Sequence, residues 1–306
     1  MILKALTFTI GLATFGLASA MSSGPKPAPP EPAVQAPAPI FVLNSLEGNV
    51  SVIDPVTWTE TKRIPTGKEP HHLYLTPDEK SVIVANALSD SLTFIDPRTA
   101  EIQRVIPGIL DPYHLRFSPD MKWFVTVANR LNHIDIYKWD GQTPTLLKRI
   151  QSAKTPSHMW IDSKSTTVWA TMQDSNELIA IDLKTQAIKW RVKTGPMPAD
   201  VFVTPDDQTL LIGMTGGDGV EVYDVSKNPA KKIKLIQTGK GAHAFRALGD
   251  KQHVLVSNRV ANSISKIDYK SLTVVDKFPG PGGPDCMDIM ADGKTILLSS
   301  RWAQKL

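Results

Sequence analysis

The sequence predicts an all-β protein, a β-propeller built from four-stranded blades, and two repeated markers predict it. An Ile-Asp pair or a close equivalent ends a short β-like run in six successive units, at intervals of 42 or 44 residues; the aspartates are Asp54, Asp96, Asp140, Asp182, Asp224 and Asp268. A second marker keeps the same interval, a Pro-X-His-like start followed by an alternating run and a Pro-Asp turn, as in PHHLYLTPDE. A period of about 42 residues holding four short strands is the length of one propeller blade.

The first twenty residues are expected to be a cleaved signal peptide. Lys4 precedes an apolar stretch over residues 5–17, and small residues follow it up to Ala20, which is the arrangement of a secretory signal. The stretch is shorter than the roughly 20 residues needed to span a bilayer. We therefore expect a periplasmic or secreted protein with no membrane span after cleavage.

Residues 21–39 are expected to form a Pro/Ala-rich linker. They contain seven prolines, spaced by Ala, Ser and Glu. Such a segment cannot bury a core and favours an extended, stiff spacer. The β-propeller domain is therefore expected over residues 40–306.

The second unit shows how four strands fit into one period. We predict strands over residues 72–75, 81–85, 91–95 and 102–106, separated by turns rich in Pro, Asp and Ser. The second strand is nearly continuous in apolar residues, as expected of a strand buried on both faces. Solenoids of paired helices share the period, but runs of five or six residues between Pro-Asp turns leave no room for helices.

Composition excludes several classes of function. The chain has 34 Lys and Arg against 30 Asp and Glu, a formal charge of +4, and the basic residues are scattered, which argues against nucleic acid as a partner. A single cysteine, Cys286, excludes an internal disulfide framework and a zinc site built on several thiolates.

One position of the repeat carries residues with binding chemistry. Alignment of the units places the following residues at the start of the innermost strand, which lines the central channel: His72, His114, His158, Asp200, His243 and Cys286. Imidazole is a common metal ligand and titrates near neutral pH. We therefore predict a ligand site at this mouth of the channel, with the four histidines as candidate metal ligands.

A second ring is expected on the same face, directly after the second strand of each unit. It includes Arg130, Arg259 and Arg301, which are candidates for holding a carboxylate or phosphate. The residue before this ring is often Asn, as in Asn86 and Asn258, and we expect those side chains to stabilise the blade turns. The expected partner is thus a small anion, a metal ion or a protein that docks at the channel face.

The runs over residues 82–108 and 254–280 resemble the YVTN-type β-propeller repeat, which has a Val-Ala-Asn strand, an Ile-Asp turn and a closing Gly-X-X-Pro. This family is related to YncE-like propellers and to the haem domain of cytochrome d1, and the resemblance covers residues 40–306. It implies seven blades. Six Asp markers and the start of a seventh unit are present, so we expect an incomplete last blade, and the first unit begins at Ile40 with its second strand. Alternatively there are six blades, with residues 286–290 completing the first.

Two functions are compatible with these features, since a propeller fold does not by itself specify an activity. One is a non-enzymatic, exported binding protein that uses the His/Arg face. The other is a cofactor- or metal-dependent enzyme or redox accessory protein. Resemblance to haem-carrying nitrite reductases implies an axial histidine and propionate-binding arginines, whereas a lactonase-like site needs acidic ligands, and Asp200 is the only acidic residue of the inner ring. No particular cofactor is predicted.

Overall fold

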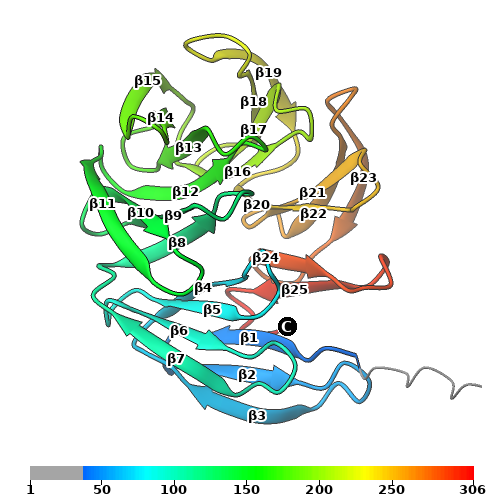
Figure 1. The fold of residues 1–306 in the computed structure, drawn as a ribbon. Coiled ribbons are helices and arrows are strands. Elements are labelled where there is room, and N and C mark those ends of the chain that lie inside the picture. Colours follow the sequence, from blue (N-terminus) through cyan, green and yellow to red (C-terminus); the bar gives the residue numbers. More distant parts are fainter. Residues whose placement is uncertain (1–36) are drawn as a thin grey trace, which may run out of the picture. The chain divides into compact units, whose positions relative to one another are not determined.

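The computed structural model describes residues 37–306, which form 25 β-strands and no helix (Figure 1). The strands make seven antiparallel sheets around a common axis, five with four strands, one with three and one with two. The predicted all-β propeller is therefore confirmed. The predicted signal peptide and residues 21–36 of the predicted linker lie outside the described residues. Over residues 37–306 there is no helix long and apolar enough to cross a bilayer.

Each sheet is one blade, and the blades follow the chain. Blades 2 to 6 contain β4–β7, β8–β11, β12–β15, β16–β19 and β20–β23, while blade 1 has β1–β3 and blade 7 has β24–β25. The innermost strands are β4 (Pro70–Leu75), β8 (Pro112–Phe117), β12 (Pro156–Ile161), β16 (Pro198–Val203), β20 (Ala242–Ala247) and β24 (Pro284–Ile289). The second strands are β1 (Ile40–Asn44), β5 (Val82–Asn86), β9 (Trp123–Ala128), β13 (Thr167–Met172), β17 (Thr209–Met214), β21 (His253–Asn258) and β25 (Ile296–Ser300).

The two outer positions of each blade complete the set. The third strands are β2 (Asn49–Ile53), β6 (Ser91–Ile95), β10 (His133–Trp139), β14 (Glu177–Asp182), β18 (Gly219–Asp224) and β22 (Ser263–Asp268). The fourth strands are β3 (Glu60–Pro65), β7 (Ile102–Pro107), β11 (Pro144–Gln151), β15 (Ala187–Lys193), β19 (Lys231–Gln237) and β23 (Thr273–Pro279). In blade 2 the boundaries agree with the predicted strands to within two residues.

The six-blade alternative is wrong. β24, which contains Cys286, pairs with β25 and not with β1, whose own partner is β2. In Figure 1 the red strands β24 and β25 lie between blade 6 and the blue strands of blade 1. The sheet that contains Ile40–Asn44 begins with the second strand of a blade, as predicted.

The Ile-Asp marker of the repeat is a turn that joins the third and fourth strands. In blade 2, Asp96 Oδ1 accepts hydrogen bonds from the backbone N–H groups of Arg98 (2.8 Å) and Thr99 (2.9 Å). Asp54, Asp140 and Asp268 accept the same pair of bonds in their own blades. An aspartate that bonds its own backbone two residues on defines an Asx turn, which explains why the sequence repeats this residue.

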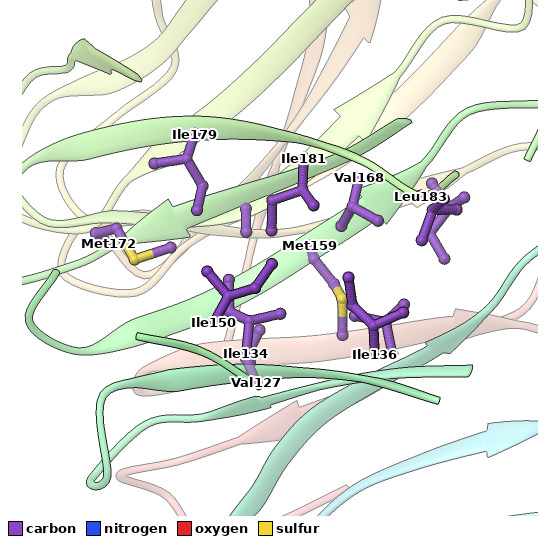
Figure 2. Close-up of a cluster of buried hydrophobic side chains, with 13 residues drawn as sticks. Val127, Ile134, Ile136, Ile150, Met159, Val168, Met172, Ile179, Ile181 and Leu183 are labelled. Atoms are coloured by element: carbon purple, nitrogen blue, oxygen red, sulfur yellow. The ribbon is translucent and has the colours of Figure 1, made fainter. Parts of the chain in front are cut away.

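The cores lie between neighbouring blades, because the second and third strands are buried on both faces. All five residues of β5 are buried, whereas β15 alternates between exposed and half-buried residues. Figure 2 shows Val127, Ile134 and Ile136 of blade 3 facing Met159 and Ile181 of blade 4. The resulting ring holds the inner strands of successive blades side by side around the axis.

Candidate metal centre on the propeller axis

Each innermost strand that carries a histidine begins with a β-bulge. In β4, Pro70 pairs with Asn86 and His72 pairs with Ala85, so the inner strand has one more residue than its partner over this step. β8 shows the same shift between Pro112 and His114. A bulge bends a strand and re-aims side chains, and here it brings successive imidazoles together on the axis.

Three imidazoles form the centre of this arrangement, and we call His72, His114 and His158 the imidazole trio. Their side chains come from three successive blades and are almost fully buried, with exposed fractions of 9%, 0% and 3%. The ring centroids of His72 and His114 lie 4.9 Å apart, as do those of His114 and His158, and His72 and His158 lie 5.2 Å apart. One ring nitrogen from each lies within 4.8 Å of the others.

In each member of the trio, one ring nitrogen forms a hydrogen bond with a group outside the trio, which we call its outer partner. His72 Nδ1 donates to the backbone oxygen of Tyr113 at 2.6 Å, which leaves Nε2 as the lone-pair nitrogen. His114 Nε2 bonds the hydroxyl of Tyr74 at 2.6 Å, and His158 Nδ1 bonds the hydroxyl of Ser157 at 2.8 Å. His114 Nδ1 has no hydrogen-bond partner among the described residues. Metal-binding histidines show this division, in which an outer partner fixes the tautomer and orientation.

Burial keeps these imidazoles neutral. Desolvation lowers the pKa of His72 to about 4, although the Tyr113 carbonyl and Asp285 oppose the shift. Desolvation and the neighbouring histidines lower the pKa of His114 and His158 well below the usual value. A neutral imidazole is the form that binds a metal ion, whereas an imidazolium that would hold an anion is disfavoured here.

His243 was predicted as a fourth member of the same position, and the structure shifts it by one residue. Ala242 pairs with Asn258 as Pro156 pairs with Met172, so His243 corresponds to Ser157, and Ala244 is the true equivalent of His158. The His243 ring still packs on His158, with centroids 5.5 Å apart. Its nitrogens face Thr215 Oγ1 at 3.0 Å and Asp285 Oδ1 at 3.3 Å, so it lies beside the trio.

Asp200 lies in the inner ring but has a different role. Its Oδ1 accepts from the N–H of Val201 at 2.8 Å and its Oδ2 from the N–H of Phe245 in the next blade at 2.9 Å. Burial raises the pKa of this carboxyl. Asp200 thus joins blades 5 and 6. It does not belong to the group of possible metal ligands, which consists of His72, His114 and His158.

The arginine ring is largely neutralised by carboxylates. Arg130 pairs with Glu69 at 2.9 Å and with Asp111 at 2.8 Å. Arg259 donates to Asp285 through Nε at 3.1 Å and through a second guanidinium nitrogen. Arg301 is mostly exposed and lies 4.0 Å from the same carboxylate. The structure therefore does not bring these three guanidinium groups together on one free anion site.

Sequence reasoning missed four neighbours of the trio. His71 lies at the mouth, where its Nδ1 is 2.9 Å from His72 Nδ1 and its ring centroid is 3.9 Å from that of Tyr113. Desolvation lowers the pKa of His71 to about 2. Tyr74, Tyr113 and Asp285 complete the surroundings. The dipeptide His71-His72 was a visible signal, but the bulge that turns both rings inward has no sequence signature.

Cys286, the last residue predicted for the inner ring, is exposed near the start of β24.

Comparisons with known proteins agree with the architecture. A sequence model of the YNCE-like beta-propeller family matches residues 6–306. The Salmonella typhimurium protein named "Uncharacterized protein YncE" is 28% identical over 169 residues, which is 54% of this chain and 47% of the relative. The alignment thus spans about half the length of that curated relative.

Two solved structures share the fold at low sequence identity. Hydrazine synthase from Kuenenia stuttgartiensis superposes with a TM-score of 0.74 at 16% identity, covering 92% of this chain and 97% of that one. Dihydro-heme d1 dehydrogenase NirN, in complex with DHE, superposes with a TM-score of 0.66 at 15% identity, covering 90% and 71%. These likenesses concern the fold alone.

Proposed function

Because the chain belongs to the YNCE-like beta-propeller family, whose fold does not itself specify a ligand, we propose a function from the axial site. The protein is an exported binding protein that holds one transition-metal ion through His72, His114 and His158. The export part of this proposal rests on the signal-like residues 1–20.

One observation carries the proposal: three buried, neutral imidazoles from three blades converge, each held from outside by a second partner. Their candidate ligand atoms lie within 4.8 Å of one another. A tetrahedral ion with metal–nitrogen bonds of about 2.1 Å needs such atoms roughly 3.4 Å apart. Each ring therefore has to move inward by less than about 1 Å, which a side-chain adjustment supplies.

The ligand set selects the class of ion. Imidazole nitrogen suits Zn²⁺, Cu²⁺, Ni²⁺ and Fe²⁺, while Ca²⁺ and Mg²⁺ require oxygen ligands. Asp200, the acidic member of the inner ring, is engaged with two backbone N–H groups. The site is thus unlike the oxygen-rich centre that a lactonase-like activity requires.

Haem does not fit among the trio. The four rings of His72, His114, His158 and His243 pack at centroid distances of 4.9 to 5.5 Å, so a planar macrocycle cannot enter between them. Arg130 and Arg259, which could have bound propionates, are paired with carboxylates.

A metal-dependent enzyme is the second candidate. Three protein ligands with one open position are typical of catalytic zinc sites. We place binding first because the trio is 9% exposed at most, so a substrate would have to reach an ion that lies beneath His71 and Tyr113.

The test is metal analysis of the exported protein recovered from the periplasm of the expressing cell, where we expect Met21 as the first residue. The purified protein is then freed of metal and titrated with Zn²⁺, Cu²⁺, Ni²⁺ and Mg²⁺ by calorimetry. We expect one ion per chain for at least one of the first three, none for Mg²⁺, and a higher melting temperature for the loaded protein, because the ion binds the folded state.

Matched variants locate the site. H114Q and H158Q should each weaken binding by at least about 100-fold, since the loss of an outer partner alone costs 10- to 100-fold. H243Q is the control, because His243 packs against His158 but faces Asp285; its affinity should stay within about threefold of the native value. Equal binding by H114Q and the native chain would place the ion elsewhere and refute the proposal.

A further inference from the structure

A cavity of about 400 Å³ lies between blades 2 and 3, at the end of the inner strands opposite the imidazole trio. Its walls come from the Thr76–Ser81 turn, from the outer strand β7, from the turn between β8 and β9, and from the end of β10 with the turn that follows it. They include Lys80, Gln103, Arg104, Met121 and Trp139. Ligand sites of small molecules have this range of volume and combine apolar walls with a few polar groups.

Two of the lining residues have a buried N–H donor without a hydrogen-bond partner among the described residues. Trp139 is 5% exposed, and its indole Nε1 has no hydrogen-bond partner among the described residues. The same is true of Arg104 Nε. A buried donor without a partner costs about 1–3 kcal/mol, so each such group calls for a partner that the protein itself does not supply.

The repeat shows that both donors are specific to this interface. By strand register, Ile95 of blade 2 corresponds to Tyr137 of blade 3, whereas Trp139 lies two residues further along, in an extension of β10 that has no counterpart in β6. At the register position of Arg104, blades 1 and 3 have Lys62 and Lys148. Trp139 and Arg104 therefore both differ from what the neighbouring blades have, and both line the same cavity.

Arg104 is held in position for an incoming ligand. Its guanidinium lies over the Phe94 ring, 4.1 Å from the centroid, and its Nη2 donates to the backbone oxygen of Gln142 in the next blade at 3.0 Å. The Phe94 and Trp139 rings are parallel, with centroids 6.3 Å apart. A fixed guanidinium loses little side-chain freedom on binding, and it suits planar carboxylates.

The charges on the wall favour an anion. Lys80 and Arg104 are cationic, and Asp78 is the one carboxylate among the residues that line the cavity. Asp78 is itself occupied, since its Oδ1 accepts from the N–H of Lys80 at 3.3 Å and its Oδ2 lies 3.7 Å from Lys80 Nζ. The lining residues alone thus have one positive charge in excess, while Asp140, next to Trp139, is a second carboxylate within electrostatic range of Arg104.

We infer that this cavity between blades 2 and 3 binds a small monocarboxylate, with the carboxylate accepting from Arg104 and Trp139 and the apolar part lying against Met121. The site is separate from the imidazole trio and does not depend on the proposed metal.

The probe for this inference is sodium benzoate, titrated into the full chain by calorimetry and by ligand-observed NMR, with benzyl alcohol as the neutral isostere. We expect saturable binding of benzoate and none of benzyl alcohol. Trp139→Phe removes the donor and retains the aromatic ring, and Arg104→Met removes the guanidinium. Each variant should weaken benzoate binding by about tenfold or more.

The matched control is Lys148→Met, because Lys148 is exposed and has the register position of Arg104 in the next blade. It should bind benzoate as the native chain does. The inference is overturned if benzoate does not bind the native chain, which would mean that water satisfies the two donors, or if Trp139→Phe and Arg104→Met bind it unchanged. Melting curves of all variants establish that they are folded.

Discussion

At the scale of single residues, the hydrogen bonds around the imidazole trio decide which nitrogen faces the centre. The carbonyl of Tyr113 only accepts, so His72 Nδ1 carries the proton and Nε2 has the lone pair. The hydroxyl of Tyr74 can accept from His114 Nε2, which frees the lone pair of Nδ1. Desolvation raises the pKa of Tyr74, so its hydroxyl stays protonated.

Tyr74→Phe tests the outer partner of His114. Without the hydroxyl the His114 ring keeps its packing but loses the bond at 2.6 Å that orients it, so metal affinity should fall by about 10- to 100-fold. Calorimetric titration with Zn²⁺ or Cu²⁺ measures the change. Tyr137→Phe is the control, because Tyr137 bonds Asp135 in an outer strand; equal losses in both variants would show a general effect on stability.

Sequence reasoning found the trio but not its surroundings, and the bulges explain the difference. His72, His114 and His158 share a repeat position, which an alignment of units detects. His243 lies one residue earlier in register, yet its ring reaches His158 because residues within a bulge are not bound by the alternation of a regular strand. His71 lies at the mouth for the same reason. The carboxylates that occupy the arginines belong to loops whose contacts cross between blades.

At the scale of the elements, the turns explain why the strands could be predicted. The Asp marker bonds its own backbone, as Asp182 does with the N–H of Thr185 at 2.7 Å. The Pro-Asp turn also closes locally, since Thr76 N–H donates to the Ser81 carbonyl at 2.8 Å. Interactions between near neighbours leave a trace in the sequence. The pairing of β24 with β25 likewise agrees with the incomplete seventh blade that the repeat predicts, and it decides against the six-blade alternative.

Asp182→Ala and Asp182→Asn test this turn. The alanine variant loses the acceptor for Thr185, which should reduce the free energy of unfolding by about 1 kcal/mol. Asparagine keeps an oxygen in the same place and should retain most of that stability. Urea unfolding of the two variants and of Lys184→Ala, from the same turn, measures the effect. Equal losses in the alanine and asparagine variants would show that the side-chain bond does not stabilise the turn.

At the scale of the whole molecule, the ring of blades brings buried, neutral imidazoles from several inner strands together at the propeller axis. Six histidines have a pKa lowered chiefly by desolvation. Five of them lie at the axis, namely His71, His72, His114, His158 and His243, and the sixth is His133 in an outer strand. In the unfolded chain the same residues titrate near 6.5. The unfolded state therefore binds more protons than the folded state below about pH 6.5, and folding becomes less favourable as the pH falls.

We expect the metal-free protein to lose stability between pH 6.5 and 4. Each histidine contributes at most about 1.4 kcal/mol per pH unit, and His72 stops contributing once the pH reaches its folded pKa of about 4. Domains of this kind are stable by about 5–15 kcal/mol, so acid unfolding should have its midpoint near pH 5. Urea unfolding at several pH values, with a chelator present, measures how the free energy of unfolding depends on pH. H158Q replaces one titrating imidazole by a side chain of similar size that does not titrate, so it should reduce this dependence. A free energy of unfolding that stays constant from pH 7 to pH 5 would mean that these imidazoles take up protons in the folded propeller, and that water reaches the propeller axis.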